Sequence, residues 1–172
     1  MDKSKKLVER FKIKEREVPL KIAYLEFYYK LNEKDKIDEL LKEMRSLMRK
    51  REERLYEPEY YLFLGKREWE KRRIRASMGH LETALEKAEE IGKIELVWRI
   101  YHLLAKINLS LKNIEKSYTY FDRARETLVK LAGNIEEASL RQSYLDDQEK
   151  RELLSDMKVL AETATHEVMV MA

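Results

Sequence analysis

Cysteine is absent from the 172 residues of this chain, and glycine and proline are scarce, with four and two residues. Without cysteine the chain can form neither disulfide bonds nor thiolate metal sites, and it has no thiol nucleophile. The scarcity of glycine and proline argues against long disordered linkers. No apolar run approaches the roughly 20 residues that a membrane-spanning helix needs. We therefore expect a soluble, cytoplasmic protein without a membrane partner.

The short motifs of common enzyme and cofactor sites are also missing. The sequence contains no glycine-rich phosphate loop, no GxSxG and no HExxH. It has no Glu-x-x-His pair of the kind that binds two iron ions in helical bundles. We therefore assign no catalytic residue, no metal ligand and no cofactor, and we do not expect an enzyme.

Charged residues and strong helix formers make up most of what is present. Asp, Glu, Lys and Arg account for 40% of the chain, against about 25% in an average soluble domain. Leucine, lysine, glutamate, arginine and alanine all favour helices, and charge at this density suits solvated helix faces. The composition predicts an all-α fold.

Two stretches of the chain repeat one pattern at an offset of 40 residues. Residues 60–69 read YYLFLGKREW and residues 100–109 read IYHLLAKINL. A weaker copy precedes them, in which the bulky Leu25 and Met44 replace small residues. The stronger matches are Tyr61 with Tyr101, Leu64 with Leu104, Gly65 with Ala105, Ser77 with Ser117, Leu81 with Phe121, and Ala84 with Ala124.

Turn signals divide each copy into two helices. Asn32 and Asn113 interrupt their copies near the middle, and asparagine is a common turn residue. Gly92 and Gly133 lie where a glycine just past the last turn would end the second helix. Each copy therefore predicts a helix, a turn and a second, antiparallel helix.

Gly65 lies inside a predicted helix, where glycine costs about 1 kcal/mol relative to alanine. A small residue at this position lets the two helices of a hairpin approach closely where they cross. Dispersion and burial at the crossing then offset the lost helix propensity. We expect Gly65 and Ala105 to face small residues of the second helix in their own hairpins.

The pattern resembles the tetratricopeptide repeat (TPR): an aromatic residue, Leu-Gly three residues on, then small, aromatic and small residues in the second helix. The likeness covers roughly residues 17–131, and a period of 40 instead of 34 is similar to the extended subclass. It departs from the family at Asn108, where an aromatic residue is usual, and in lacking the closing proline.

The resemblance implies a solenoid of about three helical hairpins with a C-terminal capping helix, working as a protein-interaction scaffold. It is closest in character to TPR regions of bacterial multidomain regulatory proteins, so the chain would be a segment of a larger signalling protein. Asp146 and Glu149 have the spacing of a capping box and predict a closing helix over 149–160. The expected division is a basic, helical N-terminal segment over 1–16, hairpins within 17–134 at about 17–56, 57–96 and 97–134, capping helices over 135–165, and a tail over 166–172.

In the family, the first helices of the hairpins line a concave face that binds ligands. Carried over by position, this face offers apolar and aromatic side chains with three basic ones above them. Such a surface suits a peptide or amphipathic helix carrying acidic residues. The predicted peptide-binding residues are Tyr29, Leu62, Phe63, Lys66, Trp69, Arg99, His102, Leu103 and Lys106.

Several alternatives remain open from the sequence. Residues 70–79 contain no glycine or asparagine at the expected turn, which leaves a single helix over 59–91, and hence a coiled coil, as a competing structure. Some predicted ligand contacts could instead be core residues. The family's carboxylate clamp is disfavoured, because only Arg99 keeps the required charge. Self-association stays open.

Nucleic-acid binding is the second functional hypothesis. Residues 66–75 hold six basic and two acidic residues, and residues 1–16 hold seven basic and three acidic residues. From residue 135 onward the balance reverses, with four basic and nine acidic residues. Trp69 is the only aromatic residue within 66–75, so base stacking is poorly supported and nucleic acid is the less favoured partner.

Overall fold

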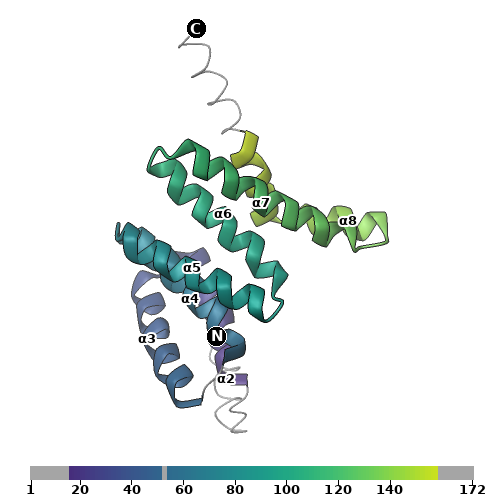
Figure 1. Ribbon diagram of the computed structural model, residues 1–172. Coiled ribbons are helices and arrows are strands. Elements are labelled where there is room, and N and C mark those ends of the chain that lie inside the picture. The colour runs from purple at the N-terminus through teal and green to yellow at the C-terminus, as the bar shows by residue number, and fades with distance from the viewer. Residues whose placement is uncertain (1–15, 52–53, 159–172) are drawn as a thin grey trace.

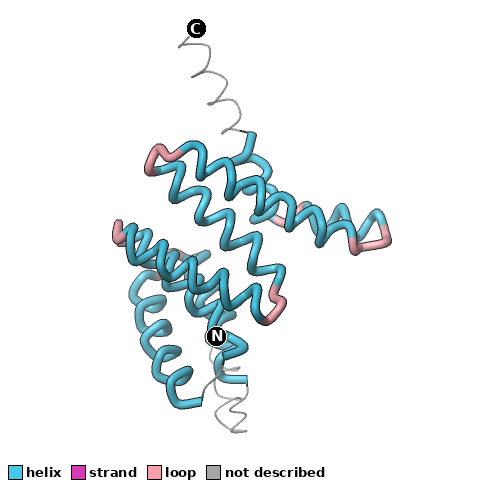
Figure 2. The backbone as a smooth tube through the Cα atoms, viewed as in Figure 1, coloured by secondary structure: helices cyan, strands magenta, loops and turns pink. Residues whose placement is uncertain are grey.

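The computed structural model describes residues 16–51 and 54–158. Its elements are helices joined by short turns, with no strand among the described residues, and the predicted all-α class is confirmed (Figures 1 and 2). Most of the predicted basic segment 1–16, the end of the capping region and the tail 166–172 lie outside those residues. The elements are α2 (Glu17–Leu31), α3 (Lys34–Arg51), η2 (Arg54–Tyr56), α4 (Glu57–Glu70), α5 (Ile74–Glu90), α6 (Ile94–Ser110), α7 (Ile114–Gly133) and α8 (Ala138–Leu145).

Helices that follow each other along the chain pack as pairs. The strongest contacts join α4 with α5 and α6 with α7, and α2 packs on α3. Neighbouring pairs also meet through α5 and α6, α3 and α4, and α4 and α6. Figure 1 shows the pairs lying one upon another, from α2 and α3 at one end to α6 and α7 at the other. After α8 the chain returns as a further helical stretch over residues 148–158, which we call the closing segment.

The three turns inside the pairs share one backbone geometry at 40-residue intervals. Asn32, Arg72 and Lys112 each have a left-handed φ, of 55°, 60° and 59°. In each turn the next N–H, of residue 33, 73 or 113, donates to the carbonyl five residues earlier at 3.0, 2.9 and 2.9 Å. This is the hydrogen bond that ends a helix in a Schellman motif. The left-handed φ at Arg72 also shows that a single helix over 59–91 is wrong, because α4 ends before the turn.

The second and third pairs share a further contact that the first pair lacks. The hydroxyl of Ser77 donates to the carbonyl of Gly65 at 2.7 Å, and that of Ser117 donates to the carbonyl of Ala105 at 3.0 Å. A Cβ added to Gly65 would lie 2.6 Å from Leu81 Cγ and 3.2 Å from the Ser77 carbonyl oxygen. The predicted close crossing at Gly65 is thus confirmed.

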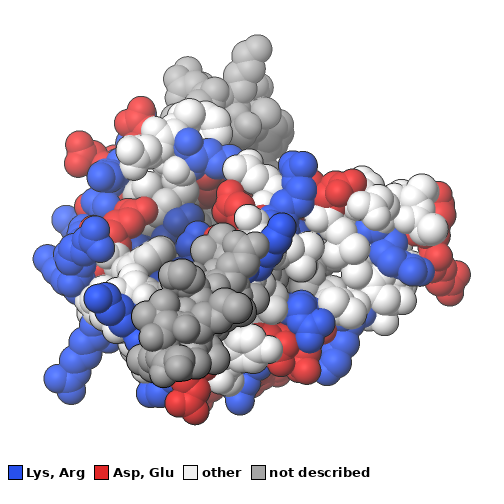
Figure 3. Space-filling model, turned by 90° about the horizontal axis from the view of Figure 1, so that it is seen from above, with Lys and Arg blue, Asp and Glu red and all other residues white. Residues whose placement is uncertain are grey.

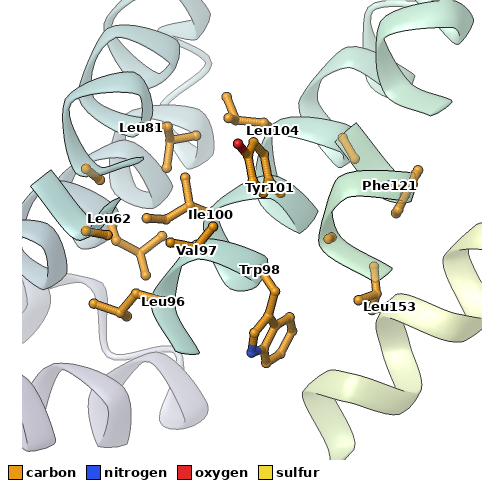
Figure 4. Packing of buried hydrophobic residues seen from close by; sticks show 14 of the residues in the cluster. Leu62, Leu81, Leu96, Val97, Trp98, Ile100, Tyr101, Leu104, Phe121 and Leu153 are labelled. Carbon is orange, nitrogen blue, oxygen red and sulfur yellow. The ribbon is translucent and has the colours of Figure 1, made fainter. Parts of the chain in front are cut away.

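Buried side chains form two hydrophobic clusters that share α4. The first, which we call the N-terminal core, joins α2 and α3 to Tyr60 and Phe63 of α4. The second, the C-terminal core, joins Leu62 of α4 to α5, α6, α7 and Leu153 of the closing segment (Figure 4). Helix α4 therefore presents one face to each core, and the strip between these faces is where the candidate site lies.

Two predicted helix ends differ from the structure. Gly92 has a φ of +70° and follows α5 as predicted, but Gly133 is the last residue of α7, whose C-cap is Asn134. The closing segment is not capped by Asp146, because the Asp147 carboxylate accepts from the N–H of Glu149 at 3.0 Å. The Asp146 side chain instead accepts from Gln142, four residues earlier in α8. The predicted end of α7 was therefore two residues early, since the C′ residue follows the C-cap, and the predicted cap of the closing segment was one residue early.

Candidate functional site

The predicted ligand face is one strip of side chains on α4 and another on α6. Helical spacing places residues 62, 63, 66 and 69 together on α4 and residues 99, 102, 103 and 106 together on α6. These strips border a surface cavity that the closing segment completes on its far side. We call this cavity the groove; its lining residues are Leu62, Phe63, Lys66, Trp69, Trp98, Arg99, His102, Leu103, Lys106, Glu149 and Glu152.

A second cavity of about 420 Å³ adjoins the groove and extends it to α2. Tyr29 lines this extension, which shares Phe63, Lys66 and Arg99 with the groove. The structure therefore brings all nine predicted side chains to one continuous hollow, although whether they bind a peptide stays a prediction. The wall contributed by the closing segment was not predicted.

Two of the predicted apolar contacts are mainly core residues. Leu62 is 5% exposed and belongs to the C-terminal core, and Phe63 is 4% exposed and belongs to the N-terminal core. The Phe63 ring stacks on that of Tyr29 with 5.5 Å between ring centroids, and the Tyr29 hydroxyl donates to the Phe63 carbonyl at 3.2 Å. Burial raises the pKa of Tyr29, so its hydroxyl stays protonated as a donor. The half-buried Trp69 and Leu103 are left as the accessible apolar surface of the groove.

Lys66 differs from the other predicted cations because it has no carboxylate partner among the described residues. Its ammonium group lies 4.3 Å from the centroid of the Tyr29 ring, a cation–π contact. Burial lowers the pKa of Lys66, and the nearby carboxylates of Glu149 and Glu70 act in the opposite direction without reaching ion-pair distance. Within the described residues, Lys66 is thus a half-buried positive charge that faces the groove unpaired.

The remaining predicted cations of the groove are already paired within the chain. Arg99 reaches Glu149 of the closing segment at 2.8 Å and Glu26 of α2 at 3.3 Å. Asp156 of the closing segment lies 2.8 Å from His102 Nε2 and 3.5 Å from Lys106 Nζ. Carboxylates from two distant parts of the chain therefore occupy these positive groups.

His102 is held as a neutral hydrogen-bond donor. Burial lowers the pKa of its imidazole, and the hydrogen bond to Asp156 raises it by a smaller amount. Because a carboxylate can only accept, Nε2 carries the proton in this pair. This arrangement positions the closing segment against α6, and whether His102 contacts a ligand stays a prediction.

Trp98 is the groove residue on α6 that the sequence did not indicate. It is 1% exposed, and its indole N–H has no acceptor among the described residues. In Figure 4 the indole lies between α6 and the closing segment, with the Lys150 ammonium 5.8 Å from the ring centroid. Its position four residues before His102 on the same helix face was the available signal. A buried, unpaired donor costs free energy and marks imperfect packing under the closing segment.

Half of the basic residues in the run 66–75 are paired with neighbouring carboxylates. Arg67 is 7% exposed and makes two 2.8 Å contacts to Asp38, while Lys71 reaches the same carboxylate at 2.9 Å. The Arg67 guanidinium thereby lowers the pKa of Asp38 to about 2. Arg73 pairs with Glu68 at 3.3 Å. In Figure 3 basic and acidic side chains lie interleaved over the face shown.

Comparison with known proteins finds no matching family model, curated protein or solved structure. Over residues 16–51 and 54–158, no helix combines the length and apolar character that crossing a bilayer requires. The same residues contain no cluster of three histidine, aspartate or glutamate side chains placed to hold a metal ion. The case for a function therefore depends on the geometry of the groove itself.

Proposed function

We propose that this chain is a TPR-like solenoid of about three hairpins that binds a segment of a partner protein in the groove. The recurrence of turn geometry and of the serine contacts at 40-residue intervals supports the repeat assignment. The helices α2, α4 and α6, first in each pair, all contribute to the hollow. By the resemblance described above, the chain would act as a cytoplasmic regulatory or scaffold segment of a larger bacterial signalling protein.

Lys66 is the observation that carries the proposal. Desolvating a cation without a counterion is unfavourable, so a groove that keeps one half-buried gains when an anion arrives. The accessible side chains beside it, Trp69 and Leu103, are apolar. The ligand chemistry that fits is a carboxylate flanked by an aromatic or aliphatic side chain, as in a short acidic peptide.

The pairing of the basic run speaks against nucleic acid as the partner. Three of its six basic residues, Arg67, Lys71 and Arg73, are engaged by carboxylates. A polyanion would have to displace these pairs before it could gain from counterion release. Among the described residues, no contact favours this second function.

Selection of peptides from a random library displayed on phage tests the proposal. The wild-type chain should enrich peptides in which Asp or Glu lies next to Trp, Phe or Leu. The Lys66→Glu variant should lose these peptides, because it places a negative charge where the carboxylate binds. The matched control Lys130→Glu reverses an exposed charge on α7 and should retain them. Enrichment without acidic residues, or equal retention by Lys66→Glu, would contradict the proposal.

A further inference from the structure

The closing segment carries the same kind of surface that the groove is proposed to bind. Its carboxylates Glu149 and Asp156 lie seven residues apart, two turns along one helix face, and pair with the cations Arg99 and Lys106 of α6. Between them, Leu153 is fully buried in the C-terminal core. The segment is thus an amphipathic helix with acids at both ends of an apolar anchor.

Charge is distributed so that this helix and the groove complement each other. Residues from 135 onward are acidic overall, and the strip on α6 that they meet carries Arg99, His102 and Lys106. Arg99 also holds Glu26 of α2, so a single guanidinium links the two ends of the described chain across the hollow. These pairs occupy the groups that an acidic partner would otherwise use.

The docked state of the closing segment is not fully satisfied. The indole N–H of Trp98 is buried beneath it, and among the described residues this N–H has no acceptor and the nearby Lys66 has no anion. Glu149 is half exposed and Asp156 one-third exposed, so water competes for both carboxylates. An occupant that also supplied an acceptor for Trp98 or an anion for Lys66 would hold the groove better than the chain's own helix does.

We propose that the closing segment is an internal, exchangeable ligand of the groove, and that the partner presents a helix with carboxylates seven residues apart and a leucine four residues after the first. The partner helix takes over Arg99, His102 and Lys106 from Glu149 and Asp156. This inference rests on the proposed function, because it assumes that the groove binds a partner. The inference adds to that function the side chains that the partner helix carries, and it identifies the closing segment as the competitor that weakens partner binding.

The test uses the full chain and a fluorescently labelled peptide with the sequence of residues 146–158, DDQEKRELLSDMK. In the wild-type chain the tethered copy competes at an effective concentration on the order of millimolar, so the peptide should bind weakly. The double variant Glu149→Gln with Asp156→Asn removes the internal carboxylates and keeps Leu153. It should bind the peptide about tenfold tighter or more, because the open state is more populated.

Two controls make the outcome decisive. The chain variant Glu86→Gln with Glu126→Gln removes two exposed carboxylates of α5 and α7 and should bind the peptide like wild type. A peptide that itself carries the Gln and Asn substitutions should lose binding to the double variant. The single variants are measured alongside, and circular dichroism checks that each chain is folded. Peptide affinity that is equal in the double variant and in the exposed-charge control would overturn the inference.

The proposed function can survive that failure. If peptides selected from the library bind wild type and the double variant equally well and still depend on Lys66, the groove binds a partner but the closing segment does not compete for it. Light scattering on the wild-type chain identifies a third case. A dimer that the double variant abolishes would assign the occupant to a second copy of this chain, and it would overturn the assignment to a separate protein.

Discussion

The two cores of this protein connect their helix pairs in different ways. The C-terminal core is a continuous set of buried aliphatic and aromatic side chains that runs from α4 through α5 and α6 to α7. The N-terminal core reaches α4 mainly through Tyr60 and Phe63, and the polar link beside it is the pairing of Asp38 with Arg67. Because apolar burial contributes more than a partly exposed ion pair, the first helix pair should open at a lower free energy than the rest.

Residue size at the helix crossings accounts for part of this difference. The second and third pairs have Gly65 and Ala105 at the crossing, each bonded to a serine hydroxyl, whereas the first pair has Leu25 at the matching place. The residue that matches Ser77 is Ile37, which is 1% exposed and has no hydroxyl to donate. The helices of the first pair therefore pack through large side chains, whereas in the other two pairs the helix backbones approach each other closely.

Phe63→Ala should have the largest effect on this contrast. Truncating a buried phenylalanine costs about 3–5 kcal/mol, and here it also removes the ring that stacks on Tyr29. Amide hydrogen exchange should accelerate more in α2 and α3 than in α6 and α7. Phe27→Ala, at a side chain that is 44% exposed, is the control and should change little. Uniform acceleration over all helices would show that the two cores unfold as one.

Gly65→Leu tests the close crossing in the second pair. The new side chain would overlap Leu81 and press on the backbone of Ser77, at an expected cost of about 1–3 kcal/mol in chemical unfolding. A Cβ added at Gly79 meets no atom within 4 Å, so Gly79→Leu should stabilise by somewhat less than 1 kcal/mol through better helix propensity. A Gly65→Leu chain that is more stable than wild type would contradict the crossing.

Asp38→Asn tests the polar link between α3 and α4. The folded pKa of Asp38, about 2, lies below its unfolded value, so the pair stabilises the fold above about pH 4 and loses this contribution as the pH falls toward 2. Because the side chain is 40% exposed, we expect a loss of only about 1 kcal/mol at pH 7. Urea unfolding at pH 7, 4 and 2.5 should show a shallower acid dependence for the variant. Glu39→Gln, an exposed neighbour, should keep the wild-type dependence.

Arg72→Gly should have a smaller, opposite effect. A left-handed φ is strained for arginine and free for glycine, so the substitution should stabilise by about 1 kcal/mol or less. Asn32→Gly, at the matching turn of the first pair, should gain less, because asparagine tolerates this conformation. Thermal melting would compare the stabilities of the two variants. A larger rise in melting temperature for Asn32→Gly than for Arg72→Gly would contradict the shared turn geometry.

The sequence predicted those parts of the fold that depend on local pattern. Its 40-residue offset located the helix pairs, the small residues at Gly65 and Ala105, and the turn at Asn32. It also predicted a turn in the second pair, but neither glycine nor asparagine marks that turn, so a single helix over 59–91 stayed open until the left-handed φ of Arg72 excluded it. The prediction that Gly133 ends its helix was wrong, because glycine permits a helix to end without requiring it to.

The sequence indicated which residues line the groove, but not which of their charges are already paired. Positions carried over from the tetratricopeptide resemblance selected Lys66 and Lys106, and the structure gathers them with Arg99 around one hollow. Nothing local indicated that Glu149 and Asp156 would neutralise two of them, because these partners lie about 50 residues further along the chain. The excess of acidic residues from residue 135 onward was the one available signal in the sequence. It does not specify which basic residues those carboxylates pair with.

The most direct test of the account compares two lysines of the groove by calorimetric titration with one acidic peptide selected on the wild-type chain. Both are changed to methionine, which keeps the apolar stem and removes the charge. Lys66→Met should weaken binding about tenfold or more, near 1.4 kcal/mol, because Lys66 has no internal anion. Lys106→Met should change the affinity less than about twofold, because it removes the competing 3.5 Å contact with Asp156 as well as the contact that the peptide would make. Equal losses at both positions, or a larger loss at Lys106, would contradict the account.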